Sequence, residues 1–317
     1  LAQISPEVVH NAFTTFWDKI DITLILNSAD APDNATDVLA ALYAESAALP
    51  VTPPVSFTDV PCAYTDFGTA GSVVSDITQG DLGIRQLVLS NNVRVNMKQT
   101  DFEENSILIT VRLGTGKLGQ LQNQTGLDGF SATVINAGGL GQHSVDELSR
   151  IFAGRNVGVE FSVADDAFQL TGGTTPEDLG LQLQLMVAQL SDPGYREEGV
   201  RQFQQAIPEI VASQRFSLDG AVNQMQAWLT GGDGRFAVPT EEQLLSFEAS
   251  DAKDWIQPQL ADSYLEVSIV GDFDPENTVS LILETFGALP VRADSPVIAN
   301  SPAIVLPEAP VNRSFTY

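Results

Sequence analysis

Hydrophobic positions in the first third of the chain follow a period of two. Apolar and polar residues alternate in IRQLVLS (84–90) and VRVNMKQT (93–100), and the alternation returns in NSILITVRL (105–113). This period is typical of strands with one buried face. Asn91 and Asn92 separate the first two runs, and asparagine tolerates the positive φ that a tight hairpin turn needs. The pattern therefore predicts a β-hairpin followed by a third strand.

A second hairpin and a group of helices are predicted further along the chain. VGVEFSVA (157–164) and AFQLTGG (167–173) are strand-like runs on either side of Asp165 and Asp166. Helical spacing predicts helices over residues 126–139, 144–155, 175–190, 196–214 and 217–229. Strands clustered in hairpins, with helices gathered between them, indicate an α+β fold. We expect a mostly antiparallel sheet with helices packed on one face.

Two segments of the chain resemble each other. Residues 21–51 and residues 264–291 both contain an apolar strand, an acidic turn, a helix and the letters ALPV, and each follows a predicted helix. Internal similarity of this length indicates duplicated modules. We therefore interpret residues 1–51 as the C-terminal part of a preceding module. The chain is then a fragment of a longer multi-module protein.

The remaining boundaries follow from composition. Residues 52–80 contain three prolines and several glycines and serines with little periodicity, which predicts a linker. Residues 81–292 hold the hairpins, the helices and the second copy of the duplicated segment, so they form one complete module. Residues 293–317 are again rich in proline and predict a connector.

Charge and cysteine content narrow the classes of partner. The chain has 317 residues and a net charge of −26, which disfavours binding to nucleic acid. No apolar run approaches the ~20 residues of a membrane span. Cys62 is the single cysteine, so no disulfide can form within the chain. Few cysteines and an acidic, lysine-poor composition favour a bacterial periplasm, cell envelope or secreted setting.

Three short motifs suggest chemistry and are better explained by structure. LGTGKLG (113–119) contains G-x-G-x-x-G, but a dinucleotide site needs this pattern to open a helix within a βαβ unit. Ser144 and Glu147 predict a capping box, which places His143 just outside a helix and exposed. His10 lies among apolar residues of a predicted helix, where we interpret it as structural. Thr175 and Ser250 are predicted to cap two further helices.

The helix GLDGFSATVINAGG (126–139) is unusual because Asp128 is its sole charge. Leu127, Phe130 and Val134 share one face, and the other side chains are small or weakly polar. A surface helix normally carries charges on its outer face. This helix is therefore either covered on several sides or derived from one that faced something other than water.

The hairpin, the third strand, GLDGFSATVINAGG, the SVDELSRI helix and the closing strand–helix with ALPV together resemble the pitrilysin/insulinase type of zinc metallopeptidase. The resemblance covers nearly the whole chain. In catalytic modules of this family the equivalent helix carries H-x-x-E-H, in which two His bind zinc and the Glu activates a zinc-bound water. The matching register puts Gly129 and Thr133 at the His positions and Ala132 at the Glu. Gln202 lies nearest to the third ligand, a Glu on a later helix.

None of these four side chains can replace the residue that the family uses. Glycine and alanine offer no donor atom, and neutral Gln or Thr is a poor zinc ligand. The resemblance therefore implies a non-catalytic module that forms the wall of a peptide-enclosing chamber and scaffolds a catalytic half. Its expected partners are the catalytic module of the same polypeptide or of a homologous subunit, together with peptide substrates. Zinc is expected in that catalytic module, and no cofactor or metal is expected in this chain.

Two alternatives stay open. The chain is a structural or assembly subunit without peptidase activity, as some members of the resembled family are, or it is an enzyme whose active site lies elsewhere. An HxxEH motif encoded before Leu1 would favour the peptidase interpretation. Stoichiometric zinc and chelator-sensitive peptide cleavage by the chain itself would favour the relocated site.

Overall fold

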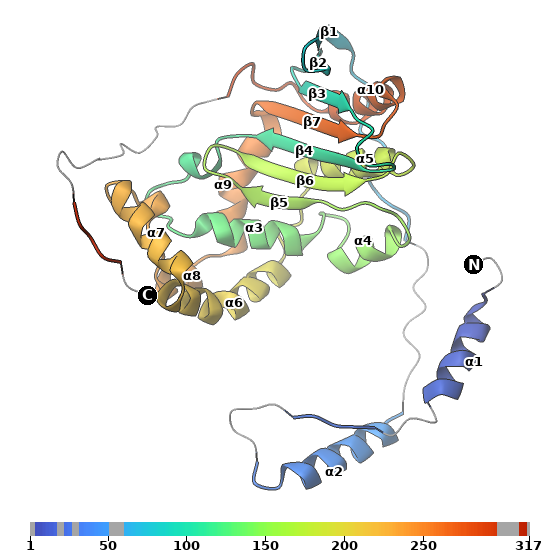
Figure 1. The fold of residues 1–317 in the computed structure, drawn as a ribbon, viewed down its shortest axis with the longest axis vertical. Coiled ribbons are helices and arrows are strands. Elements are labelled where there is room, and N and C mark those ends of the chain that lie inside the picture. Colours follow the sequence, from blue (N-terminus) through green and yellow to red (C-terminus); the bar gives the residue numbers. More distant parts are fainter. Residues whose placement is uncertain (1–3, 18–21, 27–31, 51–59, 297–310, 316–317) are drawn as a thin grey trace. The chain divides into compact units, whose positions relative to one another are not determined.

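The computed structural model of the protein describes residues 4–17, 22–26, 32–50, 60–296 and 311–315. The chain divides into two compact units, an N-terminal unit (residues 1–58) and a main unit (residues 59–317), which are described separately (Figure 1). None of the helices in the described part of the chain is both long and apolar enough to cross a membrane.

The N-terminal unit contains two helices, α1 (Pro6–Trp17) and α2 (Ala35–Ala48). None of its described residues is buried, and apolar side chains such as Phe16 and Ile25 are 70% and 87% exposed. The strand predicted before α2 is not formed, since residues 22–26 pair with no other described strand. A single segment cannot satisfy the hydrogen bonds of a strand without a neighbouring strand, so its sequence alone does not produce sheet.

A seven-stranded sheet forms the centre of the main unit, in the order β1-β2-β3-β7-β4-β6-β5 (Figure 1). Its strands are β1 (Val73–Gln79), β2 (Ile84–Leu89), β3 (Arg94–Gln99), β4 (Ile107–Leu113), β5 (Glu160–Val163), β6 (Phe168–Thr174) and β7 (Leu265–Gly271). Every neighbouring pair is antiparallel except β3 and β7. The predicted α+β fold with a mostly antiparallel sheet is confirmed.

Both predicted hairpins are present, and an additional strand extends the first of them. Asn92 adopts a φ of 65° in the turn between β2 and β3, as that turn requires. Strand β1, however, lies inside the segment that the sequence predicts to be a linker. It is an edge strand in which Val73 packs against the core and the other apolar side chains are exposed, with Val74 at 64% and Ile77 at 55%. It therefore buries too little to show a hydrophobic period.

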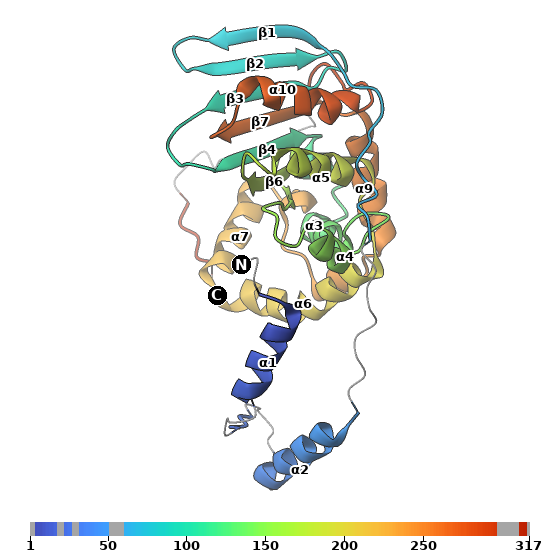
Figure 2. The ribbon, with the colours of Figure 1, turned by 90° about the vertical axis from the view of Figure 1, so that its right-hand side faces the viewer.

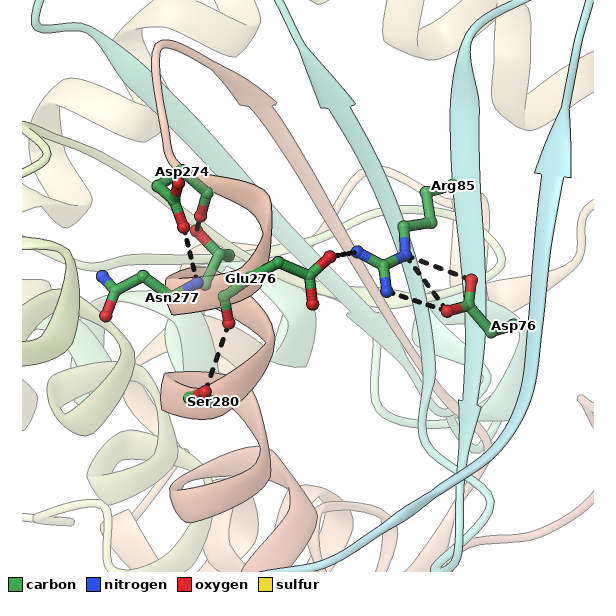
Figure 3. Close-up of polar contacts among 7 residues, drawn as sticks. Asp76, Arg85, Asp274, Glu276, Asn277 and Ser280 are labelled. Carbon is green, nitrogen blue, oxygen red and sulfur yellow. Dashed lines mark hydrogen bonds and ion pairs between the residues drawn. The ribbon is translucent and has the colours of Figure 1, made fainter.

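Arg85 fastens this edge strand to the rest of the unit (Figure 3). Its guanidinium lies 2.8 Å from Asp76 of β1 and 2.6 Å from Glu276 of helix α10 (Pro275–Glu284). The hydrogen bonds from Arg85 lower the pKa of the Asp76 carboxyl. Because both carboxylates are largely exposed, the pairs contribute modestly to stability and mainly fix the position of β1.

Helices cover one face of the sheet (Figure 1, Figure 2). The α-helices besides α10 are α3 (Leu127–Gly138), α4 (Val145–Ile151), α5 (Leu179–Ser191), α6 (Glu197–Phe216), α7 (Leu218–Leu229), α8 (Glu241–Leu245) and α9 (Ala249–Asp262). In β4, Ile109 and Val111 are buried in the core shared with α5, α9 and α10, whereas Leu108 points to the other face and is 64% exposed. The alternation in the sequence thus assigns the buried face correctly.

Two helix starts differ from the sequence prediction. Helix α9 has its N-cap at Glu248, two residues before the predicted cap Ser250, and the Asp251 carboxylate accepts a hydrogen bond from the Glu248 amide at 2.8 Å. Helix α5 begins at Leu179 rather than near Thr175. Residues 175–178 form a turn whose Asp178 carboxylate accepts hydrogen bonds from Arg155 (3.0 Å) and the Asn156 amide (2.7 Å). These contacts hold residues 175–178 in a turn against the preceding loop, so the helix begins only at Leu179.

Candidate functional site

Helix α3 is covered on several sides. It packs against α6, α9 and β5. Phe130 in its first turn lies edge-on to Phe203 of α6, with ring centroids 5.1 Å apart, and stacks on Phe247 at 5.3 Å. Full burial of such an aromatic side chain is among the larger contributions to a core. The shortage of charge in α3 therefore has a packing explanation.

A glycine allows α6 to approach α3 closely. A Cβ atom on Gly199 would lie 2.7 Å from the Cα of Val134, closer than real Cβ contacts allow. Gly199 lies one turn before Phe203, so this close approach lies beside the Phe130–Phe203 contact. Gly199 thus sets the distance between α6 and α3. Helix α3 carries Gly129, Ala132 and Thr133, which we call the degenerate positions because the resemblance predicts zinc ligands and a general base there.

Two of the degenerate positions lie together on an open part of α3. Nothing lies within 4 Å of the position that a Cβ on Gly129 would take. The Thr133 hydroxyl donates to the Gly129 carbonyl at 3.0 Å, within the helix. Ala132 is turned toward the core and packs against it. The hydroxyl of Thr133 is thus committed to the helix backbone, and the other two side chains have no ligating atoms.

Gln202 and Gly129 do not line the same cavity. It lies exposed on α6 and lines a separate depression with Ala137 and Glu198. Among the residues that the structure describes, no group of three or more His, Cys, Asp and Glu side chains could hold a metal ion. Gly129, Ala132, Thr133 and Gln202 therefore do not fit zinc, and no metal-dependent step can be assigned to them.

A cavity of about 320 Å³ lies directly beside Gly129. Its rim holds an ion pair that the sequence analysis missed, with Lys117 Nζ 2.8 Å from the Asp128 carboxylate. Lys117 also lies over the ring of Phe236, 5.4 Å from its centroid. The sequence feature that could have revealed this ion pair is that Asp128 is the sole charge of an otherwise uncharged helix. A charge in that setting needs a partner, and Lys117 is the sole charge of the preceding glycine-rich loop.

The glycine-rich loop itself is tied to the β5–β6 turn. Residues 116–119 form a short 3₁₀ helix. The amides of Lys117 and Leu118 donate to the carbonyls of Ala164 and Asp165, at 3.0 and 2.8 Å. Amides held in this way are unavailable to a phosphate, which agrees with a structural explanation of the G-x-G-x-x-G pattern.

His143 is buried, so its predicted exposure is wrong. The capping box of Ser144 and Glu147 is present, but the imidazole is only 4% exposed. Its Nε2 accepts from the Ala63 amide at 2.9 Å, and Tyr64 lies edge-on to the ring. Residues 60–64, which lie in the segment that the sequence predicts to be a linker, dock here and cover the imidazole. A cap motif predicts local geometry and carries no information about a segment that returns from far along the chain.

Comparisons with known proteins agree with this fold. No protein-family model matches the sequence. The chain is 25% identical over 229 residues to the chloroplastic stromal processing peptidase of Arabidopsis thaliana, covering 71% of this chain and 18% of that protein. The periplasmic protease PqqL of Escherichia coli has a similar structure, with a TM-score of 0.63, 20% identity, and coverage of 94% of this chain and 35% of that one.

A third solved structure is also similar in fold. The structure of a peptidase M16 inactive domain from Pseudomonas fluorescens gives a TM-score of 0.59 at 13% identity, covering 72% of this chain and 55% of that chain. The resemblance to the pitrilysin-type (M16) peptidases is therefore confirmed at the level of the fold. The chain spans under a fifth of the curated relative that it matches.

Proposed function

We propose that the main unit is a non-catalytic module of a larger pitrilysin-type peptidase. The observation that carries this proposal is the set of side chains at the zinc positions, where Gly129, Ala132 and Thr133 supply neither ligands nor a general base. Zinc and peptide cleavage belong, in this proposal, to a catalytic module of the same polypeptide or of a homologous subunit. The main unit forms a wall of the chamber that encloses the peptide and scaffolds the catalytic half.

The N-terminal unit supports a multi-module organisation. Its apolar side chains, including Phe13 and Trp17 at 57% each, are exposed within the unit. In the main unit, the segment that resembles residues 22–26 is β7, which is paired on both sides and buried on one face. We propose that the N-terminal unit is the end of another module, in which its strand joins a sheet and its helices cover that sheet.

Localisation in a bacterial periplasm or cell envelope is part of the same proposal. It rests on the acidic composition and the single cysteine, and the relative PqqL is described as periplasmic. Cell fractionation of the native organism, followed by detection with an antibody to the main unit, tests it. Recovery of the protein in the cytosolic fraction would contradict it.

Metal analysis and a cleavage assay on the purified chain test the lack of catalysis. We expect far less than one zinc per chain after dialysis against buffer with trace zinc, and no cleavage of a mixture of unfolded peptides. One zinc per chain, lost to a chelator together with cleavage, would contradict the proposal and favour an active site elsewhere in the chain.

The partner prediction is tested by adding the catalytic part of the parent protein. If that part carries HxxEH, we expect it to cleave peptides faster when this chain is present. If the parent encodes no HxxEH, and no chain that purifies with it does, the protein is an assembly subunit instead.

A further inference from the structure

We propose that the cavity beside Gly129 binds one apolar side chain of a peptide, with the adjoining peptide group held by side-chain amides of α6 and α7. The cavity lies between the start of α3, the α6–α7 pair and residues 236–244. The peptide nature of the ligand rests on the proposed function, whereas the cavity and its lining do not. A binding site at this place would give a non-catalytic module a direct part in peptide selection.

The apolar walls of the cavity are held in place by the core. Phe203 is 4% exposed and fixed by its edge-on contact with Phe130. Leu244 is 2% exposed and belongs to the same cluster. Phe236 forms another wall, beneath the ammonium of Lys117. Because these side chains are already packed, an apolar ligand would enter a preformed site and would not have to order the walls.

The charged groups at the rim do not make the cavity an ion site. Lys117 and Asp128 face each other at 2.8 Å and are each about one-fifth exposed, at 21% and 22%. Their charges are mutually compensated, so a free anion or cation would have to break the pair to bind. A neutral ligand leaves the pair intact.

Uncommitted polar groups in the lining are amides. Gln214, Asn223 and Gln226 line the cavity. Among the described residues, none of the three side-chain amides is hydrogen-bonded to another residue; Gln214 is half-buried, and Asn223 and Gln226 are exposed. A carboxamide offers both a carbonyl acceptor and N–H donors, which complement the N–H and C=O of a peptide group. Amides around an apolar hollow therefore match a neutral peptide residue better than a charged metabolite.

Gly129 keeps the cavity open. A side chain on α3 leans toward the N-terminus of the helix, and so a larger residue at position 129 would extend over the turn that holds Gly126 and Asp128. Those residues form part of the cavity lining, and nothing lies within 4 Å of the added Cβ. The volume of about 320 Å³ is at the lower end for small-ligand sites and suits about one amino-acid residue.

The test uses the full chain and N-acetyl-phenylalaninamide, a single apolar residue without charged termini. Saturation-transfer NMR and calorimetric titration should give a dissociation constant on the order of 1 mM, as expected for a ligand of about 15 non-hydrogen atoms. N-acetyl-glycinamide has the same peptide groups without the side chain and should bind at least tenfold more weakly. Equal binding of the two compounds, or no saturable binding of the first, would overturn the proposal.

Gly129→Leu locates the site. We expect at least tenfold weaker binding, with an unchanged or higher unfolding temperature, because leucine favours helix and enters open space. Gly80→Leu is the matched control, since Gly80 lies in the β1–β2 turn and also has nothing within 4 Å of an added Cβ. It should bind as the wild type does.

Asn223→Phe fills the cavity from α7 and serves if Gly129→Leu unfolds. Undiminished binding by either folded variant would refute the assignment of the site. The assay needs no zinc and no peptidase partner, so its failure is distinct from failure of the proposed function.

Discussion

Tyr64 anchors the start of the main unit, and removing its hydroxyl group offers a quantitative test of that anchor. The side chain is 8% exposed. Its hydroxyl donates to the Asp192 carboxylate at 2.6 Å and accepts from the Gln142 amide at 2.9 Å. A hydrogen bond to a charged group contributes about 1.5–3 kcal/mol, and one to a neutral amide about 1 kcal/mol. Tyr64→Phe should therefore lower the free energy of unfolding of the main unit by about 3 kcal/mol.

Urea unfolding followed by tryptophan fluorescence measures this loss at pH 7. Tyr43→Phe is the matched control, because Tyr43 lies in the N-terminal unit and is 43% exposed. Its unfolding curve should overlay that of the wild type. A loss below about 0.5 kcal/mol for Tyr64→Phe would mean that water replaces both bonds, and the reasoning would be wrong.

The pH dependence gives a second signature of the same anchor. Burial, followed by the hydrogen bond to Asp192, raises the pKa of Tyr64 to about 12. Because the folded-state pKa exceeds that of the unfolded chain, the stabilisation is complete below pH ~10 and is lost as the pH rises toward the folded value. The difference in stability between wild type and Tyr64→Phe should shrink over this range. Absorbance titration should also show that the variant lacks one phenol whose pKa is about 12.

Three further predictions concern other parts of the main unit. The double variant Gly129→His, Thr133→His should bind Ni²⁺ or Zn²⁺ in an equilibrium titration, because the two side chains are four residues apart on an open helix face; binding no tighter than that of either single variant would refute the register. Arg235→Leu should cost about 3 kcal/mol in urea unfolding at pH 7, because it leaves Asp233 buried without its partner at 2.7 Å. The hydrogen bond from Arg235 lowers the pKa of Asp233 below its ordinary value of 3.8, so the loss of stability in Arg235→Leu should shrink as the pH falls below about 4. A loss that is independent of pH would refute the ion pair as its cause. Gly199→Ala should cost about 1–3 kcal/mol in thermal or urea unfolding, because the added methyl meets the backbone of α3; an unchanged stability would refute the close packing.

The sheet was predictable wherever each strand has a buried face. The alternation around Ile109 sets both the period and the face that meets the helices. Strand β1 escaped prediction because its residues bury little, and residues 22–26 show the reverse case, in which an apolar run finds no neighbour. The alternation of apolar and polar residues therefore indicates which residues can be buried. It predicts a strand correctly only where the segment also pairs with a neighbouring strand.

The shape of the candidate site could not be predicted from the sequence. The replacement of the zinc ligands and base by Gly129, Ala132 and Thr133 stays a prediction from the register of one helix. The partner of Asp128 and the burial of His143 depend on residues 11 and 80 positions away, respectively, along the chain. The cavity depends on how α6 and α7 lie against the start of α3, which no short pattern encodes.

Strand β7 has a consequence for how the module is made. It comes almost last in the sequence and yet lies between β3 and β4, so it joins the group β1-β2-β3 to the group β4-β6-β5. During synthesis, β1-β2-β3 and β4-β6-β5 can form only two separate sheets, each with an unpaired edge strand, until residues 265–271 have left the ribosome. A separately made peptide carrying β7 should be able to close a module truncated before it.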